Sequence, residues 1–254
     1  MLRQPTTPAP PDEHRPAPTL PSLDPGVHLI DVDERAVGTI QSLVIDHVLT
    51  GAGRTAVWVD SNGLATTSCL TRLAPSMRLL DRIDVARAFT PYQHHSLVSQ
   101  LPEVVDDTTT LVVAPEFEYH YRSPDMRFSV ARDLVEDGVE TLTTLARSHE
   151  IPILLTRETA APLSAPLVEA ADSILDCELT RFGPRFVGEA FETLVYPVDG
   201  GFQTTLSYWA EILSVRFEAL QAGTTPASAP SPASGTADES ATMPSPEVSV
   251  DGTN

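Results

Sequence analysis

Two short apolar runs, Leu111-Val112-Val113-Ala114 and Ile151-Pro152-Ile153-Leu154-Leu155, flank a long amphipathic segment at 127–148. The segment repeats apolar residues at helical spacing, which predicts a helix with one buried face. Each run has the length and composition of a strand buried on both faces of a sheet. A strand, a helix and a second strand in this order predict an α/β fold built on a parallel sheet with helices on both faces.

The same alternation extends toward the N-terminus. We expect a helix with an apolar face over 37–48, ended by Gly51, and then a buried strand over 56–59, ended by Asp60. A helix or loop over 64–80, a strand over 83–89 and a helix over 92–101, closed by Pro102, are expected to follow.

The pattern changes after about residue 170. We expect a strand over 173–179, a turn over 181–184, a strand over 186–196, a hairpin at Asp199-Gly200-Gly201, a strand over 202–208, and a last helix over 210–222. The parallel core is therefore predicted to continue into C-terminal antiparallel strands.

Both ends of the chain have the composition of disordered segments. Residues 1–24 are rich in Pro, Thr and Ala, and residues 223–254 form a Pro/Ser/Ala tail that contains acids but no base. Such segments bury too little apolar area to offset the entropy of ordering them. We therefore expect one folded domain over residues 25–222.

The charge excludes several classes of function. The chain has 35 acidic and 16 basic residues and a net charge of −19, and every basic residue is an arginine. Such a charge opposes binding to nucleic acid or to an anionic membrane without a partner. The lack of lysine excludes every mechanism that requires a lysine side chain. The two cysteines exclude a disulfide framework, and no apolar run is long enough to span a membrane. We expect a cytoplasmic protein, salt-adapted like those of haloarchaea, or alternatively from a high-GC bacterium.

Several local strings share an order and spacing. They are Gly26 to Gln41, Trp58 to Gly63, Asp84 to Phe89 followed by Gln93 to Leu97, Leu111 to Ala114 followed by Tyr121-Arg122, and Ile153 to Thr156. Together they resemble the RecA/RadA recombinase family over roughly residues 26–210. The resemblance implies a RecA-like fold, with a phosphate-binding loop and helix at the first string, nucleotide-binding strands at the second and fourth, and a polar sensor position at the last.

The implied phosphate-binding loop lacks its chemistry. On a gapless match, Asp33 takes the first glycine position, Thr39 the lysine position and Ile40 the hydroxyl position, and Gly38 alone is kept. A phosphate loop needs the lysine to reach the phosphates and the hydroxyl to hold Mg²⁺.

The remaining catalytic positions of the implied nucleotide site are altered as well. Asp60 is kept at the end of its strand, but the glutamate that orients water in the family falls at Asn62, and the metal-linked aspartate falls at Ala114. Losing the cation, the metal ligands and the base together removes nearly all phosphoryl-transfer catalysis. We therefore expect no ATPase activity and no cofactor.

The resemblance leaves three functions open. The first is a non-catalytic accessory or scaffold in DNA recombination or repair, which binds a protein partner such as a recombinase. The second is a KaiC-like regulatory module that binds a protein and no DNA. The third is a divergent nucleotide-binding ATPase.

Weak DNA contact is expected only through a small set of arginines. By the resemblance, Arg122 and Arg127 lie at the family's first DNA-binding loop, Arg157 begins the second, and Arg181 and Arg185 flank a Phe-Gly-Pro turn. The turn arginines have the alternative of pairing with nearby acids. The neighbouring His94 and His95, with His120, are expected to be structural, because adjacent histidines on a helix rarely share one metal ion.

Overall fold

The computed structural model of the chain describes residues 20–32, 38–51, 54–157, 162–180, 183–188 and 205–223. The expected hairpin at 199–201, the strand residues beyond 188 and nearly all of both expected disordered termini lie outside these residues.

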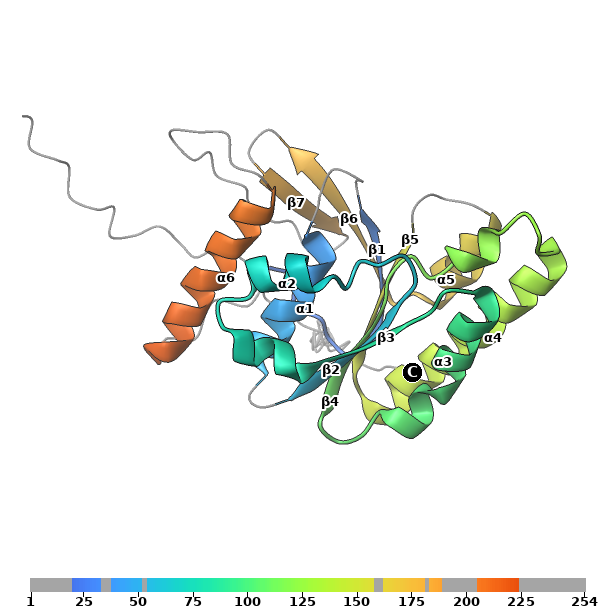
Figure 1. Ribbon diagram of the computed structural model, residues 1–254, viewed down its shortest axis with the longest axis horizontal. Helices are drawn as coiled ribbons and strands as arrows, with labels where there is room; N and C mark the ends of the chain where they lie inside the picture. The colour runs from blue at the N-terminus through green and yellow to red at the C-terminus, as the bar shows by residue number, and fades with distance from the viewer. Residues whose placement is uncertain are drawn as a thin grey trace, which may run out of the picture.

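The described residues form one seven-stranded sheet (Figure 1). Its strands are β1 (Gly26–Val32), β2 (Thr55–Asp60), β3 (Ile83–Arg87), β4 (Thr109–Ala114), β5 (Pro152–Arg157), β6 (Ser173–Thr180) and β7 (Gly183–Gly188). Their order is β3-β2-β4-β5-β1-β6-β7, and every pairing is parallel except that of β7 with β6. The expected parallel core with a C-terminal antiparallel pair is confirmed.

Helices cover both faces of the sheet, as predicted. They are α1 (Thr39–Thr50), α2 (Thr67–Leu73), α3 (Pro91–Val104), α4 (Phe128–His149), α5 (Ala165–Ala170) and α6 (Thr205–Gln221), with short 3₁₀ turns at Met77–Arg82, His120–Arg122 and Pro162–Ser164. In Figure 1, α1, α2 and α6 lie on one face of the sheet, and α3, α4 and α5 lie on the other. Among the described residues, no helix combines the length and apolarity needed to cross a membrane.

Successive residues of the central strands enter two separate cores. In β2, Trp58 packs into the core under α1, α2 and α6, while Val57 and Val59 pack into the core under α3 and α4. Side chains of a strand alternate between the faces of its sheet, so a strand covered by helices on both sides needs apolar residues at every position. This is why the runs at β2, β4 and β5 could be recognised from the sequence.

The expected strand over 202–208 is wrong where the structure describes it, because α6 already begins at Thr205. Leu206, Trp209 and Leu213 recur at helical spacing and pack into the core with α1 and α2. The burial of this stripe outweighs the strand preference of the residues around Tyr208.

Several smaller details also differ from the expectations. The helix α3 does not close at Pro102 but runs to Val104. The missing N–H of Pro102 removes a single bond close to the end of the helix. The strand β3 ends at Arg87 rather than Phe89, and β1 and α5 were not predicted as elements.

Candidate functional site

The carboxyl ends of the parallel strands gather most of the predicted site residues at one edge of the sheet. Asp60 ends β2 and Ala114 ends the adjacent strand β4, with Asn62 in the loop after β2. This edge is where open α/β sheets bind their ligands. The first glycine position of the implied loop, Asp33, lies outside the described residues.

Gly38 is the residue before the first turn of α1 and is closely covered by α6. Its φ of 87° lies in the left-handed region, which favours glycine. A Cβ built at Gly38 would lie 2.8 Å from Cδ2 of Leu206 and 3.5 Å from atoms of Leu73 and Trp209. Apolar side chains of α2 and α6 therefore occupy the space beside the start of α1.

The two residues that follow Gly38 face the interior. Thr39 is 1 % exposed, and its Oγ1 lies 3.7 Å from Sγ of Cys177 on β6. Ile40 is buried in the core between the sheet and α6. Both side chains of the expected lysine and hydroxyl positions are therefore buried.

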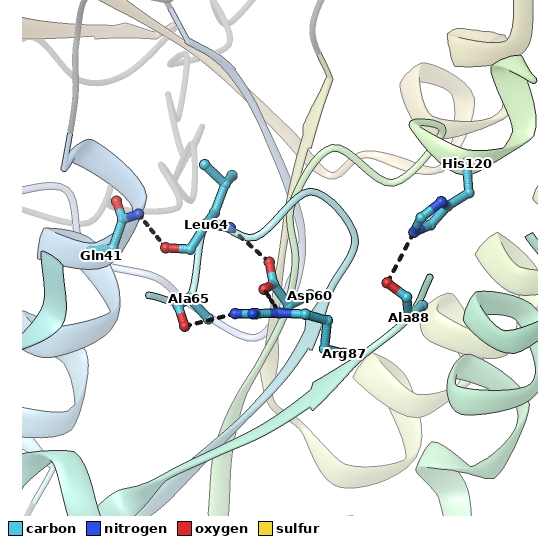
Figure 2. Close-up of polar contacts among 7 residues, drawn as sticks. All are labelled: Gln41, Asp60, Leu64, Ala65, Arg87, Ala88 and His120. Carbon is cyan, nitrogen blue, oxygen red and sulfur yellow. Dashed lines mark hydrogen bonds and ion pairs between the residues drawn. The ribbon is translucent and has the colours of Figure 1, made fainter. Parts of the chain in front are cut away.

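Asp60 uses both carboxylate oxygens to hold the loop that follows β2 (Figure 2). Its Oδ1 accepts a bond from the backbone N–H of Leu64 at 2.9 Å, and its Oδ2 accepts one from Nε of Arg87 at 2.7 Å. Arg87 also donates to the carbonyl of Ala65, and Gln41 on α1 donates to the carbonyl of Leu64. Asp60 is fully buried, so this network ties β2, β3 and α1 to the loop.

Asn62 contacts an acid that was not singled out from the sequence. Its amide nitrogen donates to Oε2 of Glu116 at 2.7 Å. Glu116 has a positive φ of 47°, and its backbone N–H donates to Oγ1 of Thr156 at the end of β5. A non-glycine residue in this region is strained, and such strain occurs often at functional turns. Ala114, just before this turn, is fully buried and carries no polar group.

Glu118, two residues after Glu116, is the most unusual acid at this edge of the sheet. It is 1 % exposed, and one of its oxygens accepts a bond from the Ser164 hydroxyl at 2.8 Å. The other oxygen, Oε2, is buried and has no hydrogen-bond partner. Burial raises the pKa of the Glu118 carboxyl, and the bond from Ser164 opposes this rise only in part. The acids directly after a buried strand, at 116 and 118, were the available sequence signal.

The predicted DNA-contacting arginines do not form one exposed track. Arg157 donates two bonds of 2.6 Å to Asp31 at the end of β1, and Arg185 lies 3.6 Å from Glu178 on β6. Arg122 and Arg127 are exposed, and the guanidinium of Arg122 lies 5.8 Å from the ring centre of Tyr119. The fifth residue, Arg181, lies outside the described residues.

The histidines pack against other side chains. The Nδ1 of His94 lies 2.8 Å from the hydroxyl of Tyr121, and His95 pairs with Asp137 on α4. Burial, together with the neighbouring His120 and His95, lowers the pKa of His94 to about 3. In the part of the chain that the structure describes, no group of three or more His, Cys, Asp or Glu side chains is placed to hold a metal ion.

Two acids stand out at this edge: the carboxyl of Glu118 is buried and has a raised pKa, and Glu116, on the strained turn, is half-buried and accepts a bond from Asn62. Of the described arginines expected to contact DNA, Arg157 and Arg185 pair with acids, and Arg122 and Arg127 are exposed. No protein-family model matches the sequence, and no curated protein is significantly similar to it.

Proposed function

We propose that this chain is a non-catalytic RecA/RadA-like protein that acts as an accessory or scaffold in DNA recombination or repair by binding a protein partner, a recombinase being the leading candidate. The observation that carries the non-catalytic part is the packing at the start of α1. Leu206 and Trp209 of α6 lie against Gly38, and Thr39 and Ile40 point into the core.

A phosphate site at the start of a helix requires free backbone N–H groups and open space for the anion. Apolar side chains against Gly38 reduce that space, and there is no lysine in the chain to neutralise the phosphates. The fold could therefore be kept while phosphoryl transfer is lost.

Nucleotide binding is tested by thermal unfolding of the full chain in about 2 M KCl, with and without millimolar ATP and Mg²⁺. We expect no change in Tm, because a ligand stabilises a protein only as far as it binds the folded state. A shift of several degrees, together with single-turnover ATP hydrolysis above background, would refute the proposal in favour of a divergent ATPase.

The protein-binding part is supported by the exposed edge of the sheet at β3. This strand pairs only with β2, so the backbone N–H and C=O groups on its other side have no strand partner in the described part of the chain. Val85 on the strand and Phe89 and Tyr92 just after it are exposed, by 44, 74 and 64 %. An open edge strand beside exposed aromatic residues is suited to receive an extended segment of another protein.

The partner is tested by titrating a haloarchaeal RadA-type recombinase into the full chain and following the complex by analytical ultracentrifugation in 2 M KCl. We expect a complex that Phe89→Asp weakens at least tenfold and Val104→Asp leaves unchanged. Val104 is a matched control because it is 56 % exposed at the far end of α3. The absence of a complex, or equal weakening by both variants, would count against the proposal.

The second candidate, a KaiC-like regulatory module without DNA binding, is favoured by the pairing of Arg157 with Asp31. A guanidinium that already donates two bonds to a carboxylate would have to give them up to contact a phosphate. Fluorescence anisotropy with single-stranded DNA separates the candidates. Affinity that falls in the double variant Arg122→Ala plus Arg127→Ala supports the recombination role, and no measurable affinity in 0.2 M KCl supports the regulatory module.

A further inference from the structure

The loop after β2 carries an asparagine followed directly by a glycine, Asn62-Gly63. The other asparagine of the chain is Asn254, at the end of the sequence. Asn62 is exposed and Gly63 is partly exposed, so water reaches both residues. The amide of an asparagine lies within reach of the next backbone nitrogen, and a glycine leaves that nitrogen unshielded because it has no Cβ. The pair therefore has the covalent arrangement in which an asparagine can lose its amide group to its own backbone.

The backbone nitrogen of Gly63 is free to react. Among the described residues it donates no hydrogen bond, whereas the N–H of the next residue, Leu64, donates to Oδ1 of Asp60 at 2.9 Å (Figure 2). A Cβ built at Gly63 would meet no atom within 4 Å, so the space around this residue is open. An N–H without a partner gives up its proton to hydroxide without first breaking a bond. The fold therefore leaves this nitrogen unprotected, although it fixes the residue that follows.

The side-chain amide of Asn62 joins two segments at the carboxyl edge of the sheet. Its Nδ2 donates to Oε2 of Glu116 at 2.7 Å, which links the loop after β2 to the turn after β4. Glu116 is half-buried and has the positive φ described above. Replacing the amide by a carboxylate would remove the donor and bring two negative charges into contact, where they repel each other. A change at Asn62 alone would thus turn this link from attraction to repulsion.

We propose that Asn62-Gly63 is a self-modification site, at which deamidation of Asn62 releases the link between the loop after β2 and Glu116. Hydroxide removes the proton of the Gly63 N–H, and the nitrogen attacks Cγ of Asn62. The N–Cγ bond forms, the Cγ–Nδ2 bond breaks, and the amide nitrogen takes up a proton and leaves as ammonia. Water then opens the succinimide ring at either carbonyl, which gives aspartate or isoaspartate at position 62. The reaction needs neither nucleotide nor partner, so it stands apart from the proposed function.

The reaction is tested by incubating the full chain in 2 M KCl at 37 °C and following position 62 by peptide mapping with mass spectrometry. A synthetic peptide with the sequence of residues 58–66 is the unfolded reference. We expect the folded chain to convert within about threefold of the rate of the peptide, because an exposed loop gives little protection. Conversion should be faster at pH 8 than at pH 6, since hydroxide generates the attacking nitrogen. Conversion at least tenfold slower in the folded chain would show that the fold protects the pair, and would overturn the proposal.

An aspartate followed by glycine inside a helix serves as an internal control. Asp137-Gly138 can form the same ring with loss of water, but Gly138 is buried within α4, where its N–H bonds to the carbonyl one turn earlier. We expect no isoaspartate at position 137 under conditions that convert Asn62. Isoaspartate forming there at an equal rate would show that the fold does not govern the reaction, which would overturn the assignment.

Three variants separate the chemistry of the pair from its surroundings. Asn62→Gln should abolish conversion, because the longer side chain must close a larger ring that forms more slowly. Gly63→Ala should slow conversion at least tenfold, because the new Cβ shields the nitrogen. Ser68→Ala, an exposed change on α2, should leave the rate unchanged. Circular dichroism verifies the fold of each variant, and an undiminished rate in folded Gly63→Ala would overturn the proposal.

The release of the link is tested with a variant that copies the charge of the product. Asn62→Asp should lower the Tm by roughly 1–3 °C, the size expected for one exposed pair of charges in a domain of this size. A contact of 2.7 Å leaves no room for a salt ion to screen the repulsion, even in 2 M KCl. Adding Glu116→Gln should restore the Tm, because the glutamine amide then donates to the new carboxylate. An unchanged Tm in Asn62→Asp, or no recovery in the double variant, would refute the release.

Discussion

The contact between α6 and the start of α1 can be measured by placing a methyl group on Gly38. Gly38→Ala forces a side chain into the left-handed region at φ 87°, which costs about 1–2 kcal/mol. The new Cβ also comes within 2.8 Å of Leu206. Because the end of a leucine side chain can shift, this overpacking adds about 1 kcal/mol, the low end of its usual range. The total loss of stability is about 2–3 kcal/mol.

Gly63 is a matched control, because its φ is 75° and a Cβ there would meet no atom within 4 Å. Gly63→Ala should therefore cost only the backbone contribution, about 1–2 kcal/mol. The difference of about 1 kcal/mol corresponds to roughly 2–4 °C in Tm for a domain of this size. Both variants are measured by thermal and urea unfolding in 2 M KCl.

A double-mutant cycle then attributes the difference to its cause. In the Leu206→Ala background the clash is absent, so Gly38→Ala should cost about 1 kcal/mol less than it does in the wild-type background. Equal Tm losses for Gly38→Ala and Gly63→Ala, with no coupling to position 206, would refute the packing on which the proposed loss of phosphate binding rests.

Three further changes test other parts of the structure. Asp60→Asn keeps the side-chain volume but removes the charged acceptor of the bonds from Arg87 and from the N–H of Leu64. It should lower the free energy of unfolding, measured by urea titration, by about 1–3 kcal/mol. Arg87→Gln should cost less, because the side chain of Arg87 is partly exposed. Burial lowers the pKa of His94 to about 3, so the neutral ring contributes fully to stability above pH 6.5. As pH falls from 6.5 toward 3, this contribution is lost at up to about 1.4 kcal/mol per pH unit. Ring NMR at pH 5 should find His94 neutral, and a protonated ring would refute the burial argument. Gly138→Ala should destabilise by about 1 kcal/mol in thermal unfolding although alanine favours helices, because the new methyl would lie 2.9 Å from Cζ of Phe117, and a gain in Tm would contradict this.

The sheet could be predicted where strands are covered on both faces, since a short continuous apolar run such as that of β4 is typical of a buried parallel strand. β1 was missed because His28 and Asp31 interrupt its apolar pattern; the structure shows that Asp31 faces Arg157 at the carboxyl edge. The early start of α6 depends on packing against Gly38, a contact between residues far apart in the chain that no local preference reveals.

The candidate site was predictable in its location but not in its contacts. Asp60, Asn62 and Ala114 do end or follow neighbouring strands, as the motif order implied. The partner of each charged group could not be read from spacing, because the Asp31–Arg157 pair joins residues 126 positions apart. The bond of Glu118 to Ser164 likewise joins residues that are far apart in the sequence.

These contacts change how an activity test on this edge has to be designed. A loss of hydrolysis in Asp60→Asn would be ambiguous, because Asp60 holds the loop and its removal would displace the whole edge. Glu118→Gln separates structure from chemistry better, since the amide oxygen can still accept the Ser164 bond while the group can no longer take up a proton. Under the proposed non-catalytic function, the wild type and this variant should show the same background rate of ATP hydrolysis. A measurable wild-type rate that this variant alone abolishes, with Tm unchanged, would identify Glu118 as a base and refute that proposal.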